Sequence, residues 1–180
     1  VAIMAGTGVA AKFGILIKDA QALELAHRIN VVAFDKTGTL TLGKPSVKNF
    51  TNFSAAEDQQ IHALALGLQM SSEHPLAKAM IQFGEQHQVN AEGYGAVLAN
   101  VGKGIEGQCL TGAYQGKTIA FVSFHAIKEH ASEQMQKVAV NELSLGHSVS
   151  CLVDVTDASN HLILALYSFG DELKPCVSEA

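Results

Sequence analysis

The sequence predicts an α/β protein in which a module of helices and antiparallel strands is inserted into a domain built on a parallel sheet. Two short apolar runs lead to this prediction: residues 31–34 end abruptly at Asp35, and residues 162–169 end at Gly170-Asp171. Unbroken apolar runs are typical of strands buried on both faces, as in parallel sheets. Between the two runs, amphipathic helices and a hairpin pattern form a segment of different character.

Composition indicates a globular chain without a nucleic-acid surface. Of its 180 residues 48% are apolar, and 17 acidic side chains exceed 12 scattered basic ones. Nucleic-acid binding needs clustered positive charge, so that partner is not expected. The three cysteines have no CxxC spacing, which favours buried thiols in a reducing compartment over disulfides. The eight histidines form no HxH or HxxxH cluster, and we expect no histidine-built metal site.

The apolar N-terminal segment, residues 1–17, is not expected to span a membrane. Lys12 and the glycines Gly6, Gly8 and Gly14 interrupt it. A spanning helix needs about 20 largely apolar residues, and the segment does not have the charge pattern of a signal peptide. The chain itself is therefore expected to be soluble.

The remaining pattern predicts further helices and strands. An aspartate cap and helical spacing of apolar residues indicate a helix over residues 19–28. A polar opening at Ser54 and a first-turn proline, Pro75, each start another helix. Strands on either side of the turn at residues 114–117 form an antiparallel hairpin. The other expected elements are strands over residues 104–111, 118–123, 148–155 and 162–169, a helix over 126–143, and a last helix from Pro175.

The main chemical signal follows the first apolar run, in the string Asp35-Lys36-Thr37-Gly38-Thr39-Leu40-Thr41. A carboxylate at a strand tip is exposed enough to attack a phosphoryl group. Lys36 adds positive charge, and the N–H and hydroxyl groups of the loop can cradle phosphate oxygens. A Mg²⁺ ion would bridge the carboxylate and the phosphoryl group. The alternative is a polar loop with a capping aspartate.

This string resembles the signature of P-type ATPases, whose aspartate accepts the γ-phosphoryl group of ATP. Residues 6–8 and 14–18 are also similar to the segment that follows the last pore helix in that family. The resemblance implies that Asp35 is the nucleophile, that Lys36 and Thr37 support the phosphate, and that Asp35 and Thr37 hold Mg²⁺. ATP and Mg²⁺ are the cofactors it implies.

Two domains follow from the resemblance. Residues 1–45 and 166–180 would form a discontinuous, truncated part of a haloacid-dehalogenase-like, Rossmann-type phosphorylation domain. Residues 46–165 would form the inserted nucleotide-binding domain, with an antiparallel sheet and flanking helices. In the full-length protein both would lie on the cytoplasmic face of the membrane, beside a transmembrane metal-transport domain that this chain does not contain.

Thr37 favours a pump over a phosphatase. Phosphatases with this fold usually place a second aspartate, a general acid and base, at the position that Thr37 occupies here. Loss of such a group slows a reaction by about 10²–10⁴-fold. We therefore expect a long-lived aspartyl phosphate, which suits coupling to a conformational cycle.

A second string, SEHPLA at residues 72–77, predicts where adenosine binds. A histidine ahead of a helix that starts with proline can stack on a purine. The alternative is an ordinary surface histidine. The string resembles the adenine-binding motif of the heavy-metal class of P-type ATPases, which implies nucleotide contacts for Glu73 and His74. Gln69 replaces a glutamate of that class and keeps a hydrogen bond to the purine without the charge.

Three further residues complete the predicted nucleotide site. Gly102 and Gly104 resemble the glycine pair that packs around the nucleotide in the family, although a β-turn explains them equally well. Lys174 resembles the basic residue that holds the nucleotide phosphates. The Gly-Asn pair of the family is missing around residues 122–123, so weakened ATP binding is expected.

The predicted function is ATP binding and aspartyl-phosphate formation in an ATP-driven heavy-metal pump, with copper(I) first and zinc or cadmium next. The Thr-Gly-Asp and Gly-Asp-Gly elements that the family carries later do not occur in this chain, so little or no turnover by the chain alone is expected. A soluble phosphatase or phosphotransferase of the same core fold is one alternative. A non-catalytic nucleotide-binding module is the other.

Overall fold

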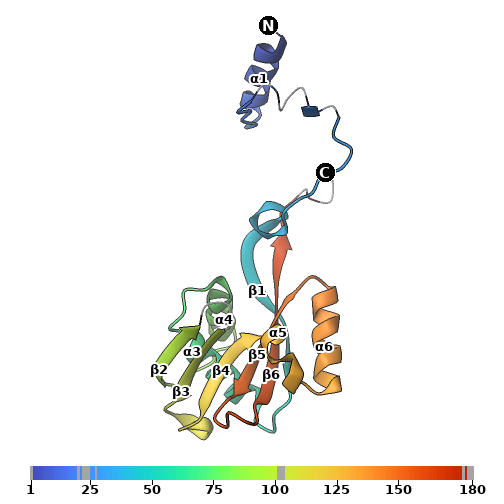
Figure 1. The fold of residues 1–180 in the computed structure, drawn as a ribbon. Coiled ribbons are helices and arrows are strands. Elements are labelled where there is room, and N and C mark those ends of the chain that lie inside the picture. The colour runs from blue at the N-terminus through green and yellow to red at the C-terminus, as the bar shows by residue number, and fades with distance from the viewer. Residues whose placement is uncertain are drawn as a thin grey trace. The chain divides into compact units, whose positions relative to one another are not determined.

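The computed structural model describes residues 2–19, 21, 25–26, 28–100, 104–175 and 177. The chain forms two compact units, Val1–Asp35 and Lys36–Ala180. The second unit contains a six-stranded sheet with helices on both of its faces (Figure 1). The predicted boundaries of a nucleotide-binding domain at residues 46 and 165 stay a prediction.

The first unit contains the helix α1 (Ala2–Lys12). No helix among the described residues is long and apolar enough to cross a membrane. The helix predicted over residues 19–28 falls largely on residues outside those described.

The prediction of a buried strand at residues 31–34 is wrong. These residues have no strand structure and are exposed, to 84% for Val31. A parallel strand is stable only beside partner strands and under covering helices. None of the described strands pairs with this run, so its apolar side chains are left in solvent.

All neighbouring strands of the sheet pair antiparallel, in the order β1-β6-β5-β4-β3-β2. The predicted hairpin is confirmed, because β3 and β4 pair with Ile105 opposite Phe121. The strands are β1 (Thr41–Asn52), β2 (Tyr94–Asn100), β3 (Gly104–Cys109), β4 (Thr118–Ser123), β5 (Ser148–Asp154) and β6 (Leu162–Leu173).

The last strand differs from its prediction. Instead of ending at Asp171 in a parallel sheet, β6 continues to Leu173 and pairs antiparallel with β1, with Ser46 opposite Gly170. The strand β1 was not predicted, and its residues include Gly43 and Pro45, which are uncommon inside strands. Figure 1 shows β1 and β6 extending together beyond the rest of the sheet. We call this paired extension, residues 41–46 and 170–173, the stem.

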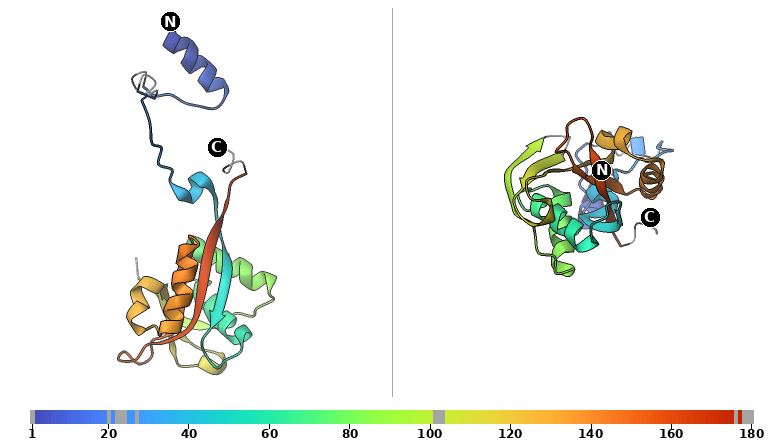
Figure 2. Two further views of the ribbon diagram at one scale, coloured as in Figure 1. Left: turned by 90° about the vertical axis from the view of Figure 1, so that its right-hand side faces the viewer. Right: turned by 90° about the horizontal axis from the view of Figure 1, so that it is seen from below.

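Helices cover both faces of the sheet (Figure 2). The helices at residues 58–69 and 75–86, which were predicted from their polar and proline starts, pack on one face of the sheet. The helices at residues 124–127 and 133–144 pack on the other face. The helix predicted over residues 126–143 is broken, because Ser132 starts a new helix by accepting a hydrogen bond from the Met135 amide. The helices are α3 (Asp58–Gln69), α4 (Pro75–Gln86), α5 (Phe124–Ile127) and α6 (Glu133–Ser144). Single helical turns of other types are η1 (Lys36–Leu40), which is π-helical, and η2 (Gly112–Tyr114) and η3 (Lys128–His130), which are 3₁₀-helical.

Alternation along the strands divides the core into two layers. In β6, Tyr167 and Phe169 face α3 and α4, whereas Leu166 faces α5 and α6. Cys109 and Cys151 are free and buried, one in each layer, as predicted for thiols. Cys176 lies outside the described residues.

Candidate functional site

The predicted nucleophile, Asp35, is the last residue of the first unit, and its side chain is exposed. An exposed carboxylate is able to meet an incoming phosphoryl group. Lys36 and Thr37 begin η1, and their side chains lie outside the described part of the chain.

The turn η1 is tied to the end of β6. The ammonium group of Lys174 donates to the carbonyl oxygen of Gly38 at 2.7 Å, and the Lys174 amide donates to the carbonyl oxygen of Leu40 at 2.8 Å. The Gly38 amide donates to the hydroxyl of Thr41 at 3.1 Å. Gly38 has φ +75°, a left-handed conformation that favours glycine. Lys174, predicted to hold phosphates, thus lies against the phosphorylation string.

The Asp171 side chain, on the β6 strand of the stem, binds the main chain of β1. One carboxylate oxygen accepts from the Gly43 amide at 2.9 Å and the other from the Lys44 amide at 3.0 Å. The Thr41 hydroxyl, with these amides, keeps the pKa of Asp171 below its ordinary value. From the sequence Asp171 is interpreted as a possible helix cap, and this role has no sequence signal, because its partners are more than a hundred residues away.

His74 caps the start of α4. Its Nδ1 accepts a hydrogen bond from the Leu76 amide at 3.2 Å, and its own amide donates to the Ser72 hydroxyl at 3.2 Å. Because Nδ1 accepts, the proton of the neutral ring is on Nε2. The side chain is exposed, as is that of Glu73, so a ring of fixed orientation is presented to solvent.

The other predicted nucleotide residues have different surroundings. Gln69, at the end of α3, is buried with 4% exposure, and its main-chain carbonyl oxygen accepts a hydrogen bond from the Ser72 amide at 2.9 Å, which links it to the His74 turn. Gly104 has φ +130°, and a Cβ there would lie 2.2 Å from the carbonyl oxygen of Phe121. Packing of β3 on β4 therefore requires this glycine, whatever it does for a nucleotide. Gly102 lies outside the described residues.

Residues that could hold a metal ion are sparse. Within the described ranges no group of three or more His, Cys, Asp or Glu side chains is arranged to hold one. Mg²⁺ does not need such a group, because it usually binds one or two carboxylates together with waters and phosphate oxygens. The exposed carboxylate of Asp35 fits that requirement.

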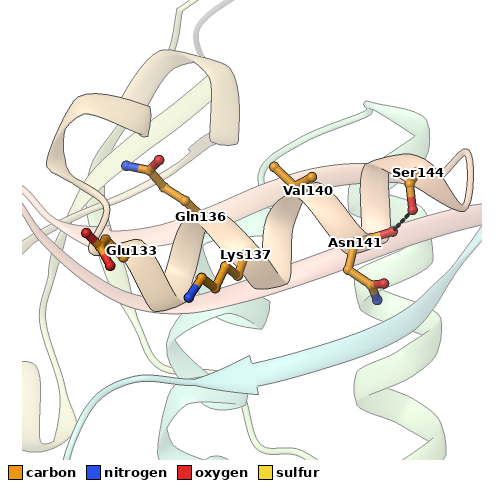
Figure 3. A pocket seen from close by; sticks show the side chains of 6 residues that line it. All are labelled: Glu133, Gln136, Lys137, Val140, Asn141 and Ser144. Atoms are coloured by element: carbon orange, nitrogen blue, oxygen red, sulfur yellow. Dashed lines mark hydrogen bonds between the residues drawn. The ribbon is translucent and has the colours of Figure 1, made fainter.

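A shallow hollow runs along the outer face of α6 (Figure 3). Because α6 packs on the face of the sheet opposite to α3 and α4, the hollow is separate from His74. Its wall contains none of the predicted site residues. The residues that line it are Glu133, Gln136, Lys137, Val140, Asn141 and Ser144.

The string that opens at Asp35 and the mixed α/β unit that follows it can now be compared with known proteins. The family model described as haloacid dehalogenase-like hydrolase matches residues 29–158, and the chain belongs to this family.

Its relatives are metal-transporting ATPases. The chain is 32% identical over 178 residues to a copper-exporting P-type ATPase of Vibrio cholerae, and 32% identical over 183 residues to a probable copper-transporting ATPase of Arabidopsis thaliana. Each alignment covers 99% of this chain and 18% of the relative, so the chain spans less than a fifth of their length.

A solved structure of a zinc-transporting PIB-type ATPase in the E2.Pi state superposes with a TM-score of 0.65 at 29% identity. The superposition covers 99% of this chain and 28% of that one. The predicted resemblance to heavy-metal P-type ATPases is thereby confirmed, as is the predicted fold class of a haloacid-dehalogenase-like α/β protein with an antiparallel module, although the parallel strand predicted at residues 31–34 is not formed.

Proposed function

We propose that this chain binds ATP and carries the phosphorylated aspartate of a P-type ATPase that transports a heavy-metal cation. Support comes from the exposed carboxylate of Asp35, which opens the string that resembles the P-type signature. Copper(I) is the first candidate for the cargo, since the relatives cited above are named as copper transporters, and zinc or cadmium comes next.

The nucleotide part of the proposal depends on His74. Its ring is exposed and fixed by the Leu76 amide, so it offers a preformed surface on which adenine stacks. Glu73 lies exposed in the turn that follows Gln69 and supplies a polar group for the purine edge, whereas the buried Gln69 would have to turn its side chain outward to supply a second. The full set proposed to contact ATP is Gln69, Glu73, His74, Gly102, Gly104 and Lys174.

The chemical step is transfer of the γ-phosphoryl group to Asp35. A carboxylate oxygen forms a bond to the γ-phosphorus, the bond to the β–γ bridging oxygen breaks, and ADP leaves. Lys36 offsets the negative charge on the phosphate, and Thr37, which cannot act as a carboxylic acid, leaves the acyl phosphate slow to hydrolyse. When bound by Asp35 and Thr37, Mg²⁺ supplies further charge neutralisation.

The proposal includes a partner domain and a location. A heavy-metal pump needs a transmembrane domain of the same full-length protein, with this part on the cytoplasmic face. Within this chain, residues 46–165 would act as the nucleotide-binding domain and residues 1–45 with 166–180 as part of the phosphorylation domain.

The nucleotide proposal is tested by NMR titration of the chain with a non-hydrolysable ATP analogue. We expect shifts in residues 69–77, and His74→Ala should weaken binding by the stacking contribution of about 1–3 kcal/mol. His87→Ala, which removes an exposed histidine at the other end of α4, is the control and should bind as the wild type does. Unshifted signals around His74 at saturating nucleotide would refute the proposed site.

The acceptor role is tested separately with beryllium fluoride and Mg²⁺, which mimic a bound phosphoryl group. We expect new shifts in η1 that disappear in Asp35→Asn. If the Asn variant shifts as the wild type does, Asp35 is not the acceptor.

A further inference from the structure

Thr41 joins the turn η1 to the stem through its hydroxyl. It is the first residue of β1, and its side chain is 2% exposed. The hydroxyl oxygen accepts a hydrogen bond from the Gly38 amide at 3.1 Å. The same hydroxyl donates to the carboxylate of Asp171 in β6. Because a hydroxyl has one donor and two acceptor sites, it makes both bonds at once. A buried side chain thus links the turn to a strand far along the chain.

Gly38 is held on both sides. Its N–H group bonds to the Thr41 hydroxyl, which fixes the peptide group before it. Its carbonyl oxygen accepts from the Lys174 ammonium group at 2.7 Å, which fixes the peptide group after it. The turn η1 is a single π-helical turn, a rare form that often occurs at functional sites. These two contacts set the direction of the N–H groups in the turn to which the proposed function assigns phosphate binding.

Asp171 extends the link into β1. Its two carboxylate oxygens accept from the Gly43 amide at 2.9 Å and from the Lys44 amide at 3.0 Å. Hydrogen bonds to an ionised carboxylate are stronger than those between neutral groups. A continuous chain of hydrogen bonds therefore runs from the Gly38 amide through the Thr41 hydroxyl and the Asp171 carboxylate to two amides of β1.

The strength of the bond to Gly38 depends on the charge of Asp171. Donation to a carboxylate makes the Thr41 oxygen a better acceptor, since successive hydrogen bonds polarise one another. The neighbouring charged side chains have other partners. Lys48 pairs with Glu172 at 3.9 Å, and the ammonium group of Lys174 donates to the Gly38 carbonyl oxygen.

We propose that Thr41 is a positioning residue for phosphorylation, which orients the Gly38 peptide toward the phosphoryl group and transmits a change there to Asp171 and β1. This inference rests on the proposed function, because it takes η1 as the turn beside the phosphorylated aspartate. Thr41 acts through Gly38 and not on the reacting atoms. The nucleotide and phosphate residues predicted from the sequence do not include it.

The hydrogen-bonded chain is tested first without a ligand, by NMR at decreasing pH. As Asp171 becomes protonated below pH 3.8, the Gly38 amide signal should move together with those of Gly43 and Lys44. Thr41→Val keeps the branched shape without the hydroxyl. In this variant Gly38 should no longer follow, whereas Gly43 and Lys44 still do.

Thr41→Ser is the matched control, because it keeps the hydroxyl and should keep all three transitions. Asp171→Asn gives a second measurement at neutral pH, where acid cannot unfold the chain. It should move the Gly38 signal when residue 41 is threonine and leave it in place in Thr41→Val. Circular dichroism checks that the variants fold. A Gly38 signal that ignores the charge of Asp171, or that responds equally in Thr41→Val, would overturn the proposal.

Transmission is tested with beryllium fluoride and Mg²⁺. In the wild type we expect shifts in η1 and, with the same dissociation constant, at Gly43 and Lys44. In Thr41→Val the shifts at Gly43 and Lys44 should be lost. The complex should also bind about 2–12-fold more weakly, the fold-change that corresponds to one neutral hydrogen bond.

The outcomes separate this inference from the proposed function. If η1 shifts while Gly43 and Lys44 stay in place, or if Thr41→Val binds as tightly as the wild type, the role of Thr41 is refuted and the acceptor role of Asp35 stands. If η1 itself does not shift in the wild type, the proposed function fails, and the role of Thr41 in phosphorylation fails with it.

Discussion

The ammonium group of Lys174 donates a hydrogen bond to the carbonyl oxygen of Gly38 over 2.7 Å. The main chain of Lys174 also donates to Leu40, so the end of β6 is bound twice to the turn η1. This turn begins directly after Asp35 in the sequence. Lys174, which directly follows β6, therefore restrains the conformation of the residues that follow the proposed nucleophile.

Lys174→Met should loosen η1 without unfolding the sheet. Methionine keeps an unbranched apolar side chain but has no donor for the Gly38 carbonyl, so the amides of η1 should exchange with solvent faster. Away from the core, such a surface change alters the free energy of unfolding by less than about 0.5 kcal/mol. Hydrogen exchange measures the effect, with Lys174→Arg as the control that keeps a donor. Identical exchange in the Met variant and the wild type would contradict this role.

The pH response of the stem follows from Asp171. Its pKa lies below the ordinary 3.8, first because of the Thr41 hydroxyl and then because of the amides of Lys44 and Gly43. A lowered pKa in the folded state stabilises the fold above the unfolded pKa, and this contribution disappears as pH falls through the lowered value. The Gly43 and Lys44 amide signals should thus stay constant from neutral pH to about 4 and move only below it.

An NMR titration checks this expectation. In Asp171→Asn the transition should be missing, because the amide side chain does not titrate. A midpoint above 3.8 in the wild type would show that the carboxylate is not held in the way described.

Glu142 should contribute to global stability. This carboxylate of α6 is 4% exposed and bonds to Asn49 of β1 and to the His147 ring, both at 2.9 Å. Glu142→Gln removes the charge and places an N–H₂ group where an acceptor was. The loss should be about 1–3 kcal/mol in urea denaturation at neutral pH. Glu133→Gln, on an exposed part of the same helix, should change stability by less than about 0.5 kcal/mol.

The effect of Glu142→Gln should also depend on pH. The Ser168 hydroxyl, the Asn49 amide and the His147 ring lower the pKa of Glu142 from its ordinary 4.5. Its contribution is therefore complete above that value and disappears as pH falls through the lowered pKa. The wild type and the variant should converge in stability below pH 4.5, and a constant difference down to pH 2 would rule out this origin.

Gly104→Ala should unfold or strongly destabilise the second unit. The added Cβ would lie 2.2 Å from the Phe121 carbonyl oxygen, and φ is +130°. Gly116→Ala is the control, since Gly116 has φ +83° with open space around it and the substitution should cost only about 1–2 kcal/mol. Thermal unfolding of both variants measures the difference. If Gly104→Ala folds normally but loses ATP binding, Gly104 serves the nucleotide rather than the packing of β3.

Local features of the sequence predicted the elements that depend on local physics. Pro75 and the polar opening at Ser54 indicated two helices that the structure contains, because capping and helical periodicity act within a few residues. The first of them, α3, begins at Asp58, four residues later than Ser54. The hairpin was predicted from its turn. The strand β1 was missed and a strand at residues 31–34 was wrongly expected, since whether a segment forms a strand depends on partners distant in the chain.

By itself, the sequence determined which reactive and binding side chains the protein has and in what order they follow one another. The order of side chains in the strings at Asp35 and His74 is written in the covalent chain, and it was enough to indicate the family that the comparisons show. The tertiary structure alone decided which groups meet. The contact of Lys174 with Gly38 and the hold of Asp171 on β1 join residues that share no local pattern. Such contacts arise from the register of β1 on β6 and from the packing of elements that are distant in the chain, and neither leaves a signal within a short stretch of sequence.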